Sequence, residues 1–372
     1  MKKVPPHLKL FFIVLALVSI GTIMIYSASA IIAQERYGDS YFFLKKQLCR
    51  VMIGVLLMLF AMNFNYRVLR RIARPLLAVT FLLLILVLTS KFGIRAGGAQ
   101  RWMRLAFFSF QPAELAKLAL ILYIADSLVR KQREVSSFLW GFLPPLLILG
   151  SFFWLIIRQP DFGTALVLAA VVFIVLFCSG VRIPHLLAFM LGALPCLYIL
   201  VYRVGYRHQR ILAFLNPWQD PMRSGFQIIQ SFLALGSGGW KGLGLGNSVQ
   251  KLFYLPAPHT DFIFAVIGEE LGFIGTAGII ILFLGFVWQG IKISLKAPDL
   301  FGNLLAVGIT SMVGLQASVN LAVVAGLLPT KGICLPFISF GGTSLILNMV
   351  GVGILLNISR KSHPEMLRES GP

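Results

Sequence analysis

Charged residues at the mouths of long apolar segments are the first candidates for chemistry in this sequence. Asp261 follows His259 and Thr260 and directly precedes a long apolar run. An isolated charge near a bilayer centre costs about 2.5–3.5 kcal/mol on insertion scales, and less toward the interface. Capping of the following helix would also account for Asp261, because a carboxylate accepts N–H groups of a first turn. Its two polar neighbours and the acids further along the same segment favour chemistry over capping.

Two of those further acids lie within the apolar run itself. Glu269 stands eight residues after Asp261, so a regular helix places it near the Asp261 face and about 12 Å deeper, with Glu270 turned away. An intramembrane acid below an acid at the entrance predicts a polar channel or cavity. His259 by itself is ambiguous. Because no second histidine stands at metal-ligand spacing, we predict no zinc site.

Two other segments begin with acids. Glu114 and Lys117 follow Gln111-Pro112 and stand three residues apart, which places their Cβ atoms about 5–6 Å apart on one helical face. They form either a self-neutralising pair that orients the helix, or part of a polar cavity in which Lys117 faces an anion. Asp161 opens the next such segment, where capping with support from the helix dipole is favoured over chemistry.

The composition indicates a membrane protein that crosses the bilayer several times. Of 372 residues, 58% are hydrophobic, and 33 basic residues stand against 13 acidic ones. A soluble protein of this length could not cover so much apolar surface. The net charge of +20 is therefore loop charge at membrane surfaces, since no basic stretch carries a nucleic-acid-binding motif. The four cysteines have no metal-ligand spacing, so neither a metal site nor a disulfide framework is predicted.

The predicted fold is all-α, a polytopic bundle of about ten transmembrane helices in a single membrane domain over residues 1–372. The ten apolar segments are 10–32, 47–64, 74–90, 110–128, 137–157, 163–180, 184–202, 261–290, 302–327 and 337–358. The first is too long for a signal-peptide core and is expected to be retained. The positive-inside rule places both termini in the cytoplasm.

The loops on the side away from the termini also carry many cations. The count of basic loop residues favours cytoplasmic termini only when the long connection at 203–260 is left out of the count. Random loop charge would explain this, and so would a face that binds an anion. We expect that connection to form a large extracytoplasmic loop with structure of its own. Its amphipathic pieces, 209–214 and 226–235, predict short interfacial helices. The glycines after them match neither a Walker A loop nor a Rossmann fingerprint.

Several longer motifs together resemble one known family, called SEDS for shape, elongation, division and sporulation. They are GAQRW at 98–102, FQPAELAK at 110–117, and the stretches 159–164, 259–265, 268–272 and 339–344. The resemblance spans essentially the whole chain. Residues 210–217, 246–252 and 328–332 resemble the divisional member more than the rod-elongation member. Ala113 departs from the pattern, because serine is usual there.

The resemblance implies a peptidoglycan glycosyltransferase with ten membrane helices. Such an enzyme polymerises lipid II, a disaccharide-pentapeptide on undecaprenyl pyrophosphate, at the outer face of the bacterial cytoplasmic membrane. In the family, the acid at the position of Asp261 is required for activity. The implied partners are a class B penicillin-binding protein, which crosslinks the new strand, and other membrane proteins of the division machinery. The implied role is septal wall synthesis. The resemblance implies no cofactor, and a requirement for a divalent cation cannot be read from the sequence.

The residues fit this chemistry. Glycosyl transfer needs a base for the acceptor hydroxyl, and Asp261 is the candidate. It also needs cations for the departing pyrophosphate, and the candidates are Arg101, Lys117, Arg210, Lys251 and Lys331. Trp102 could pack on a sugar or on lipid. The remaining expected substrate-binding residues are Glu114, His259 and Glu269.

Three other functions fit parts of the pattern. A lipid II flippase would also need a polar cavity and cationic loops, but it should depend on mid-membrane charges rather than on Asp261. A scaffold that only recruits the penicillin-binding protein would tolerate Asp261→Asn. A polymerase for elongation or sporulation would share the chemistry and differ only in its cellular role.

Overall fold

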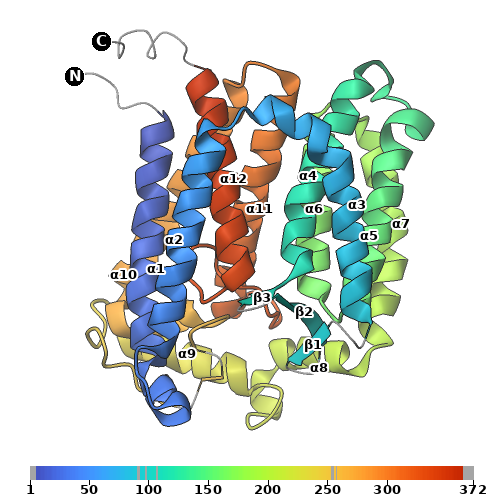
Figure 1. The fold of residues 1–372 in the computed structure, drawn as a ribbon. Helices are drawn as coiled ribbons and strands as arrows, with labels where there is room; N and C mark the ends of the chain where they lie inside the picture. The colour runs from blue at the N-terminus through green and yellow to red at the C-terminus, as the bar shows by residue number, and fades with distance from the viewer. Residues whose placement is uncertain are drawn as a thin grey trace, which may run out of the picture.

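The structure is a computed structural model, and it describes residues 6–89, 93–96, 99–105, 108–252, 255–256 and 258–362. Ten helices of 16 to 33 residues alternate in direction through one bundle (Figure 1). They are α1 (Pro6–Tyr37), α2 (Phe42–Asn63), α3 (Leu69–Leu88), α4 (Pro112–Arg130), α5 (Leu143–Arg158), α6 (Phe162–Cys178), α7 (Ile183–Tyr202), α10 (Ile263–Leu295), α11 (Leu300–Val324) and α12 (Gly342–Lys361). Each of the ten predicted segments overlaps one of them.

Length and composition separate these helices into two groups. Among the described residues, seven helical stretches are long and apolar enough to cross a membrane: α1, α7, α10, α11, α12, α3 together with η1 (Tyr66–Val68), and α5 together with η3 (Phe138–Phe142). Helix α6 is apolar but shorter. Helices α2 and α4 lie among them in the bundle (Figure 1) and carry charged side chains within the helix, such as Arg50 and Lys117. The predicted polytopic helical membrane fold is confirmed.

A small sheet forms in the connection between α3 and α4, outside the all-α prediction. Strands β1 (Gly93–Ala96), β2 (Ala99–Leu105) and β3 (Phe108–Phe110) pair antiparallel in that order. The register opposes Met103 to both Gly93 and Phe110. Pairing between the strands satisfies backbone groups that irregular structure would leave open. The sheet fixes Arg101 and Trp102 of β2 at one end of the bundle.

The long connection between α7 and α10 lies across that same end of the bundle (Figure 1). It contains α8 (Gly205–Leu215), η4 (Pro217–Gln219) and α9 (Phe226–Gly238), while η2 (Gln132–Glu134) lies in the shorter connection after α4. The two amphipathic pieces predicted as helices are thus helical. Helices α1 and α12 begin and end, respectively, at the opposite end of the bundle.

Helix α10 is interrupted at Gly272, which has φ 64° and ψ −161°. The glycine-rich segment after α9 pairs with the break. Leu243 N–H donates to the Glu269 carbonyl at 2.9 Å, and Phe273 N–H donates to the Gly239 carbonyl at 2.9 Å. The segment therefore supplies hydrogen bonds that a continuous helix would have made internally. Only glycine adopts this backbone conformation readily, and a Cβ atom here would lie 2.3 Å from Gly242 N.

Candidate active site

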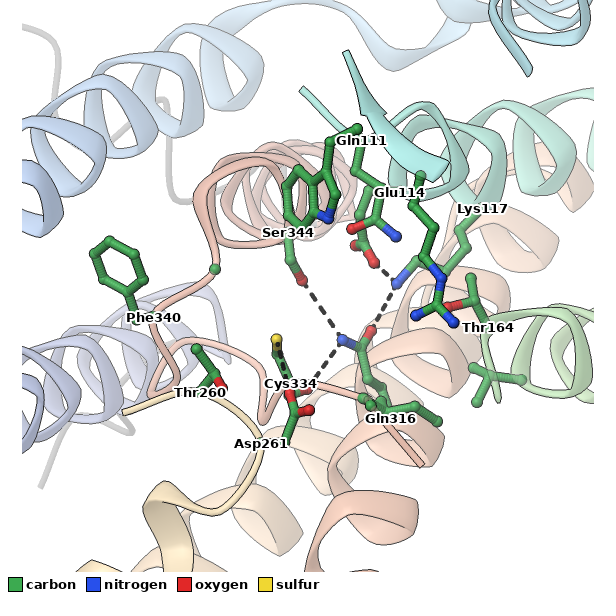
Figure 2. Close-up of a pocket in the computed structure, with 16 residues that line it drawn as sticks. Gln111, Glu114, Lys117, Thr164, Thr260, Asp261, Gln316, Cys334, Phe340 and Ser344 are labelled. Carbon is green, nitrogen blue, oxygen red and sulfur yellow. Dashed lines mark hydrogen bonds and ion pairs between the residues drawn. The ribbon is translucent and has the colours of Figure 1, made fainter. Parts of the chain in front are cut away.

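A cavity of about 240 Å³ lies at the end of the bundle that carries the sheet (Figure 2). Five of the expected site residues line it, from three separate parts of the chain: Arg101 and Trp102 of β2, Glu114 and Lys117 of α4, and Asp261 before α10. The other polar lining residues are Gln111, Thr164, Thr260, Gln316, Cys334 and Ser344. Folding thus brings the GAQRW and FQPAELAK motifs against Asp261.

Asp261 does not cap the helix that follows it. Helix α10 begins at Ile263, its N-cap residue is Phe262, and no side-chain capping hydrogen bond is made there. Asp161, in contrast, is the N-cap of α6 and accepts from Thr164 N–H at 3.3 Å. The two acids therefore differ: the capping predicted for Asp161 is confirmed, and the carboxylate of Asp261 is left for the cavity.

The segment after α11 surrounds the Asp261 carboxylate. Cys334 Sγ donates to Asp261 Oδ1 at 3.6 Å. A Cβ atom on Gly332 would lie 3.3 Å from Asp261 Oδ2, so only a small residue leaves the carboxylate this much room. The carboxylate is half-buried, and burial raises the pKa of Asp261 to about 6, against a lowering by Cys334 and by the charge of Arg101. A carboxylate with a raised pKa is suited to proton transfer near neutral pH.

The buried ion pair of α4 forms the floor of the cavity. Lys117 Nζ lies 2.8 Å from Glu114 Oε2 and donates to Gln316 Oε1 at 2.8 Å. Gln316 in turn donates to the Cys334 carbonyl at 3.1 Å. Figure 2 shows this chain of contacts running from the pair toward Asp261. The pair is self-neutralised and also lines the cavity, while an anion facing Lys117 stays a prediction.

A second hollow of about 180 Å³ gathers cations beside Asp261. Arg101, Arg207, Arg210 and Lys331 line it, together with Asp161. A third, of about 70 Å³, is lined by Arg210 and Lys331 and also by Asp261. Arg101 lines the first and second cavities alike. The carboxylate therefore lies where a polar cavity meets a cationic one.

Two of these cations are hydrogen-bonded to backbone carbonyls, and Arg101 in addition forms a long ion pair with Asp161. Arg101 donates to the carbonyls of Gln159 and Pro160 and stays 3.9 Å from Asp161 Oδ1. Arg210 Nη1 donates to the Thr330 carbonyl at 3.1 Å. Because carbonyls orient a guanidinium without cancelling its charge, both side chains keep most of their electrostatic effect on a bound anion.

Lys331 has the least compensated charge of the group. Its ammonium lies over the Phe162 ring, 5.6 Å from the centroid, and within the described part of the chain it makes no ion pair. Burial lowers the pKa of Lys331, which is the response of a cation that lacks a counter-charge. An anion entering this hollow would supply one.

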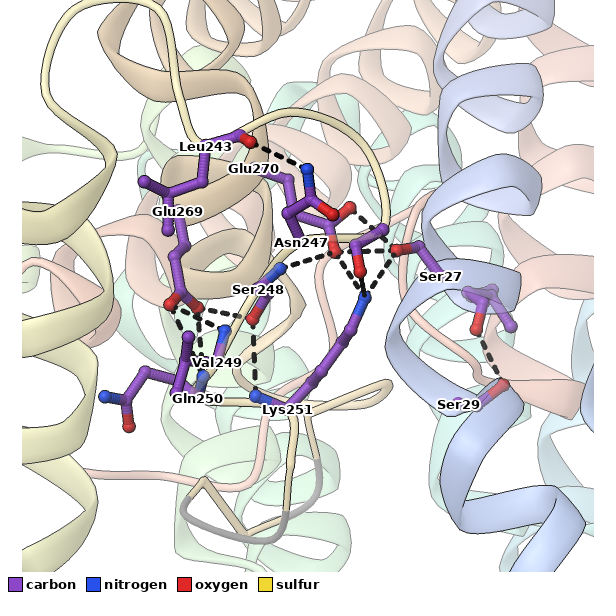
Figure 3. Close-up of polar contacts among 12 residues, drawn as sticks. Ser27, Ser29, Leu243, Asn247, Ser248, Val249, Gln250, Lys251, Glu269 and Glu270 are labelled. Carbon is purple, nitrogen blue, oxygen red and sulfur yellow. Dashed lines mark hydrogen bonds and ion pairs between the residues drawn. The ribbon is translucent and has the colours of Figure 1, made fainter.

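Lys251 and Glu269 lie outside all of these cavities, which corrects the expectation that they share the site. Lys251 Nζ forms an ion pair with Glu270 Oε1 at 2.8 Å and donates to Ser27 Oγ of α1 (Figure 3). Glu269 accepts from Val249 N–H at 2.9 Å and from the Ser248 hydroxyl. The expectation assumed a helix running through Asp261, but α10 begins after it, and residues 248–251 cover the acidic turn.

His259 also lies beside the cavity rather than in its lining. Its ring packs 4.6 Å from Phe43 and 5.7 Å from Phe340, centroid to centroid. Burial, with a smaller effect of the Arg36 charge, lowers the pKa of His259 to about 4. A neutral ring between two phenylalanines supports the loop next to Thr260 rather than contacting a ligand. This corrects its expected substrate-binding role.

Gln316 and Asn320 are functional-site residues that motif reasoning missed. They stand four residues apart in α11, on one face of a predominantly apolar helix. Gln316 contacts Lys117, and Asn320 donates to the backbone carbonyl of Asp261 at 2.8 Å. Two amides at that spacing inside a membrane segment are themselves a sign of a polar cavity, and this signal was present in the sequence.

Comparison with known proteins shows to which family the chain belongs. Residues 8–364 match the model of the family that comprises FtsW, RodA and SpoVE, described as cell cycle proteins. The chain belongs to this family. It is 50% identical to the probable peptidoglycan glycosyltransferase FtsW of Geobacter sp. (strain M18), over 92% of this chain and 93% of the relative. It is 48% identical to stage V sporulation protein E of Bacillus subtilis (strain 168), over 97% and 99%.

Solved structures agree with this membership. One chain of a peptidoglycan synthase complex, solved to describe structural coordination of polymerization and crosslinking, superposes with a TM-score of 0.79 at 33% identity, covering 96% of this chain and 98% of that chain. The rod shape determining protein RodA of Thermus thermophilus superposes with a TM-score of 0.70 at 30% identity, covering 95% and 96%. The SEDS resemblance inferred from the motifs is confirmed.

Proposed function

We propose that this chain is a peptidoglycan glycosyltransferase that polymerises lipid II, with Asp261 as its general base. One observation carries the assignment: an uncapped, half-buried carboxylate lies at the junction of a polar cavity and a cationic hollow. Glycosyl transfer from a diphosphate donor needs a base next to cations in just this way. The naming of FtsW relatives as probable peptidoglycan glycosyltransferases supports the same reaction.

The reaction is a single displacement at the anomeric carbon of the donor. The acceptor hydroxyl oxygen forms a bond to that carbon while Asp261 takes the hydroxyl proton. The bond between the anomeric carbon and the diphosphate oxygen breaks, and its electron pair leaves with the diphosphate. The new glycosidic bond has the inverted configuration. If polymer made by the purified protein retained the donor configuration, a single displacement would be excluded.

We assign the diphosphate and the acceptor sugar to different cavities. The cationic hollow with Arg101, Arg210 and Lys331 suits the diphosphate, because fixed cations stabilise the charge that develops as it departs. The larger cavity, with Trp102 on its wall, suits the sugar that carries the accepting hydroxyl. The Glu114–Lys117 pair and Gln316 position the cavity floor and bring no uncompensated charge to it. In this proposal Asp261 lies between the acceptor sugar and the departing diphosphate.

Membrane placement follows from the ends of the bundle. Helix α1 begins and α12 ends opposite the Asp261 cavity (Figure 1), and the positive-inside rule assigns that end to the cytoplasm. The connection 203–260 and the active site then lie on the outer side. The similarity to a chain of a peptidoglycan synthase complex supports a class B penicillin-binding protein as partner. Similarity to FtsW relatives supports a role at the division septum.

Polymerisation of labelled lipid II by the purified protein tests the proposal, with and without a candidate partner. Wild type should make glycan chains, and Asp261→Asn should lose about 10²–10⁴-fold in rate, the usual contribution of a positioned base. The matched control is Asp39→Asn. It makes the same substitution in an exposed loop between α1 and α2, at the same end of the bundle (Figure 1).

The outcomes separate the rival functions. Full activity of a folded Asp261→Asn variant would refute the general-base role. A wild type that makes no chains under any condition but moves lipid II across liposome membranes would make the protein a flippase. In that case Glu114 and Lys117, the charges furthest inside the cavity, would be the next residues to vary.

A further inference from the structure

A second cationic hollow lies at the end of the bundle opposite Asp261. It has a volume of about 490 Å³ and is lined by four arginines: Arg67, Arg70 and Arg71 around the start of α3, and Arg130 at the end of α4. Leu300 and Phe301, at the start of α11, form its apolar side. Glycosyl transfer at Asp261 makes no use of this region.

A buried carboxylate orients two of these arginines. Asp126 of α4 has a side chain only 1% exposed and accepts from Arg70 Nε at 3.0 Å and from Arg130 Nε at 2.7 Å. Both contacts use Nε, and the terminal Nη atoms of the two arginines make no hydrogen bond among the described residues. The Arg70 guanidinium also lies over the Phe301 ring, 5.6 Å from its centroid. Asp126 therefore fixes two guanidinium groups from different helices while leaving their outer nitrogens toward the hollow.

The hollow has an excess of positive charge. Asp299 accepts from Arg67 Nε at 2.9 Å, from the Tyr66 hydroxyl at 2.7 Å and from Gly302 N–H at 2.7 Å. Arg71 has no ion-pair partner in the part of the chain that the structure describes. Four arginines against two carboxylates leave two positive charges uncompensated. An anion that accepts several hydrogen bonds would fit here.

The surface of α3 below Arg71 indicates what carries that anion. Pro75, Ala78 and Leu82 follow at four, seven and eleven residues, on the same helical face, and all are exposed. Leu82 is 59% exposed. At 1.5 Å per residue, Leu82 at the far end of this stripe lies about 16 Å from Arg71 along the helix, close to half of a hydrocarbon core about 30 Å thick. The stripe matches one acyl leaflet beneath a headgroup at Arg71.

We infer that this hollow binds the phosphate headgroup of an anionic phospholipid, whose acyl chains lie along the exposed face of α3. The positive-inside rule alone would account for arginines at this end. The rule does not explain why a buried acid, Asp126, holds two of these arginines beside one hollow. Nor does it explain why a third, Arg71, lies without an ion pair directly above an apolar stripe. Those two features are the ones that a headgroup site needs.

Lipid retention measures this binding directly. The full-length protein is reconstituted in nanodiscs of equal parts phosphatidylglycerol and phosphatidylcholine, released, and weighed by native mass spectrometry. Wild type should retain phosphatidylglycerol in preference to phosphatidylcholine. Arg71→Gln should lower that retention about fivefold, the effect of one arginine at an anionic membrane surface. Because Arg71 makes no ion pair among the described residues, the variant should melt at the temperature of the wild type.

Arg133→Gln is the matched control, since Arg133 is exposed within η2 and lies outside the hollow. Equal retention by wild type and Arg71→Gln, or equal losses in Arg71→Gln and Arg133→Gln, would overturn the inference. A second arm titrates glycerol 3-phosphate into protein in phosphatidylcholine nanodiscs. Binding there that depends on Arg71, without retention of phosphatidylglycerol, would assign the site to a soluble phosphate and refute the lipid assignment.

Discussion

The side-chain amide of Asn320 donates to the backbone carbonyl of Asp261 at 2.8 Å and to that of Ile333 at 2.7 Å. One buried residue of α11 thus holds both the candidate base and the segment whose Gly332 and Cys334 contact its carboxylate. The geometry of the base depends on a helix 60 residues further along the chain, and neither backbone segment has regular structure of its own at that point.

The rate of polymerisation should rise with pH through the pKa of Asp261. Burial raises that pKa to about 6, so the carboxylate holds a proton below pH 6 and cannot accept another. Above pH 6 it is ionised and able to act as a base. We expect half-maximal initial rates near pH 6 in an assay between pH 4.5 and 8.5. Asp39→Asn should give the same profile, and a flat profile between pH 5 and 7.5 would argue against Asp261 as the titrating group.

Lys331→Gln should reduce the polymerisation rate by about 10²-fold, a usual effect of removing one group that stabilises developing negative charge. The variant should fold normally, because Lys331 makes no ion pair within the described structure and its burial lowers its pKa. Lys331→Arg should recover part of the rate by restoring the charge. The matched control is Lys241→Gln, at an exposed lysine in the connection between α9 and α10. An equal loss in that variant would contradict a specific role for Lys331.

Lys251→Met should reduce stability rather than the chemical step. The substitution leaves Glu270 buried without its partner, a change that costs about 3–5 kcal/mol in buried ion pairs. We expect a lower yield and a lower melting temperature, with an unchanged KM for the protein that remains folded. Adding Glu270→Met should restore much of the stability. A folded Lys251→Met protein with normal melting and a raised KM would instead return Lys251 to the substrate site.

Gly272→Ala should destabilise the protein by about 1–3 kcal/mol, because its backbone conformation is essentially confined to glycine. The new Cβ atom would also lie 2.3 Å from Gly242 N. Gly278 lies further along α10 with open space around it, so Gly278→Ala should be neutral or stabilise by about 0.5–1 kcal/mol. Thermal unfolding in detergent compares the two variants. Equal effects would mean that the interruption of α10 is not set by Gly272.

The membrane class and the helix count could be predicted from residues alone, because lipid imposes a length and a composition on each segment. The ten apolar segments each overlap a helix for that reason. The motif residues Arg101, Glu114, Lys117 and Asp261 could also be grouped in advance. What joined them was the family resemblance, since their separations along the chain carry no distance information.

Helical periodicity gives a wrong placement when residues are counted from a position that lies outside the helix. Glu269 was placed on the Asp261 face by counting along one continuous helix, but the helix begins at Ile263. Lys251 was counted among the anion-binding cations because a sequence shows charge and not its partner, and Glu270 neutralises it. The interruption at Gly272 and the pairing of the glycine-rich segment across it are likewise tertiary features.

The sequence by itself determined that the chain crosses a membrane, which family it resembles and which acid to question, because hydrophobic length and local motifs are properties of consecutive residues. Only the tertiary structure decided which charges are free to act. Lys251 and Lys331 are equally plausible along the chain, yet a buried glutamate lies against the first and an aromatic ring against the second. The difference depends on contacts between distant segments, and it decides which lysine can bind an anion.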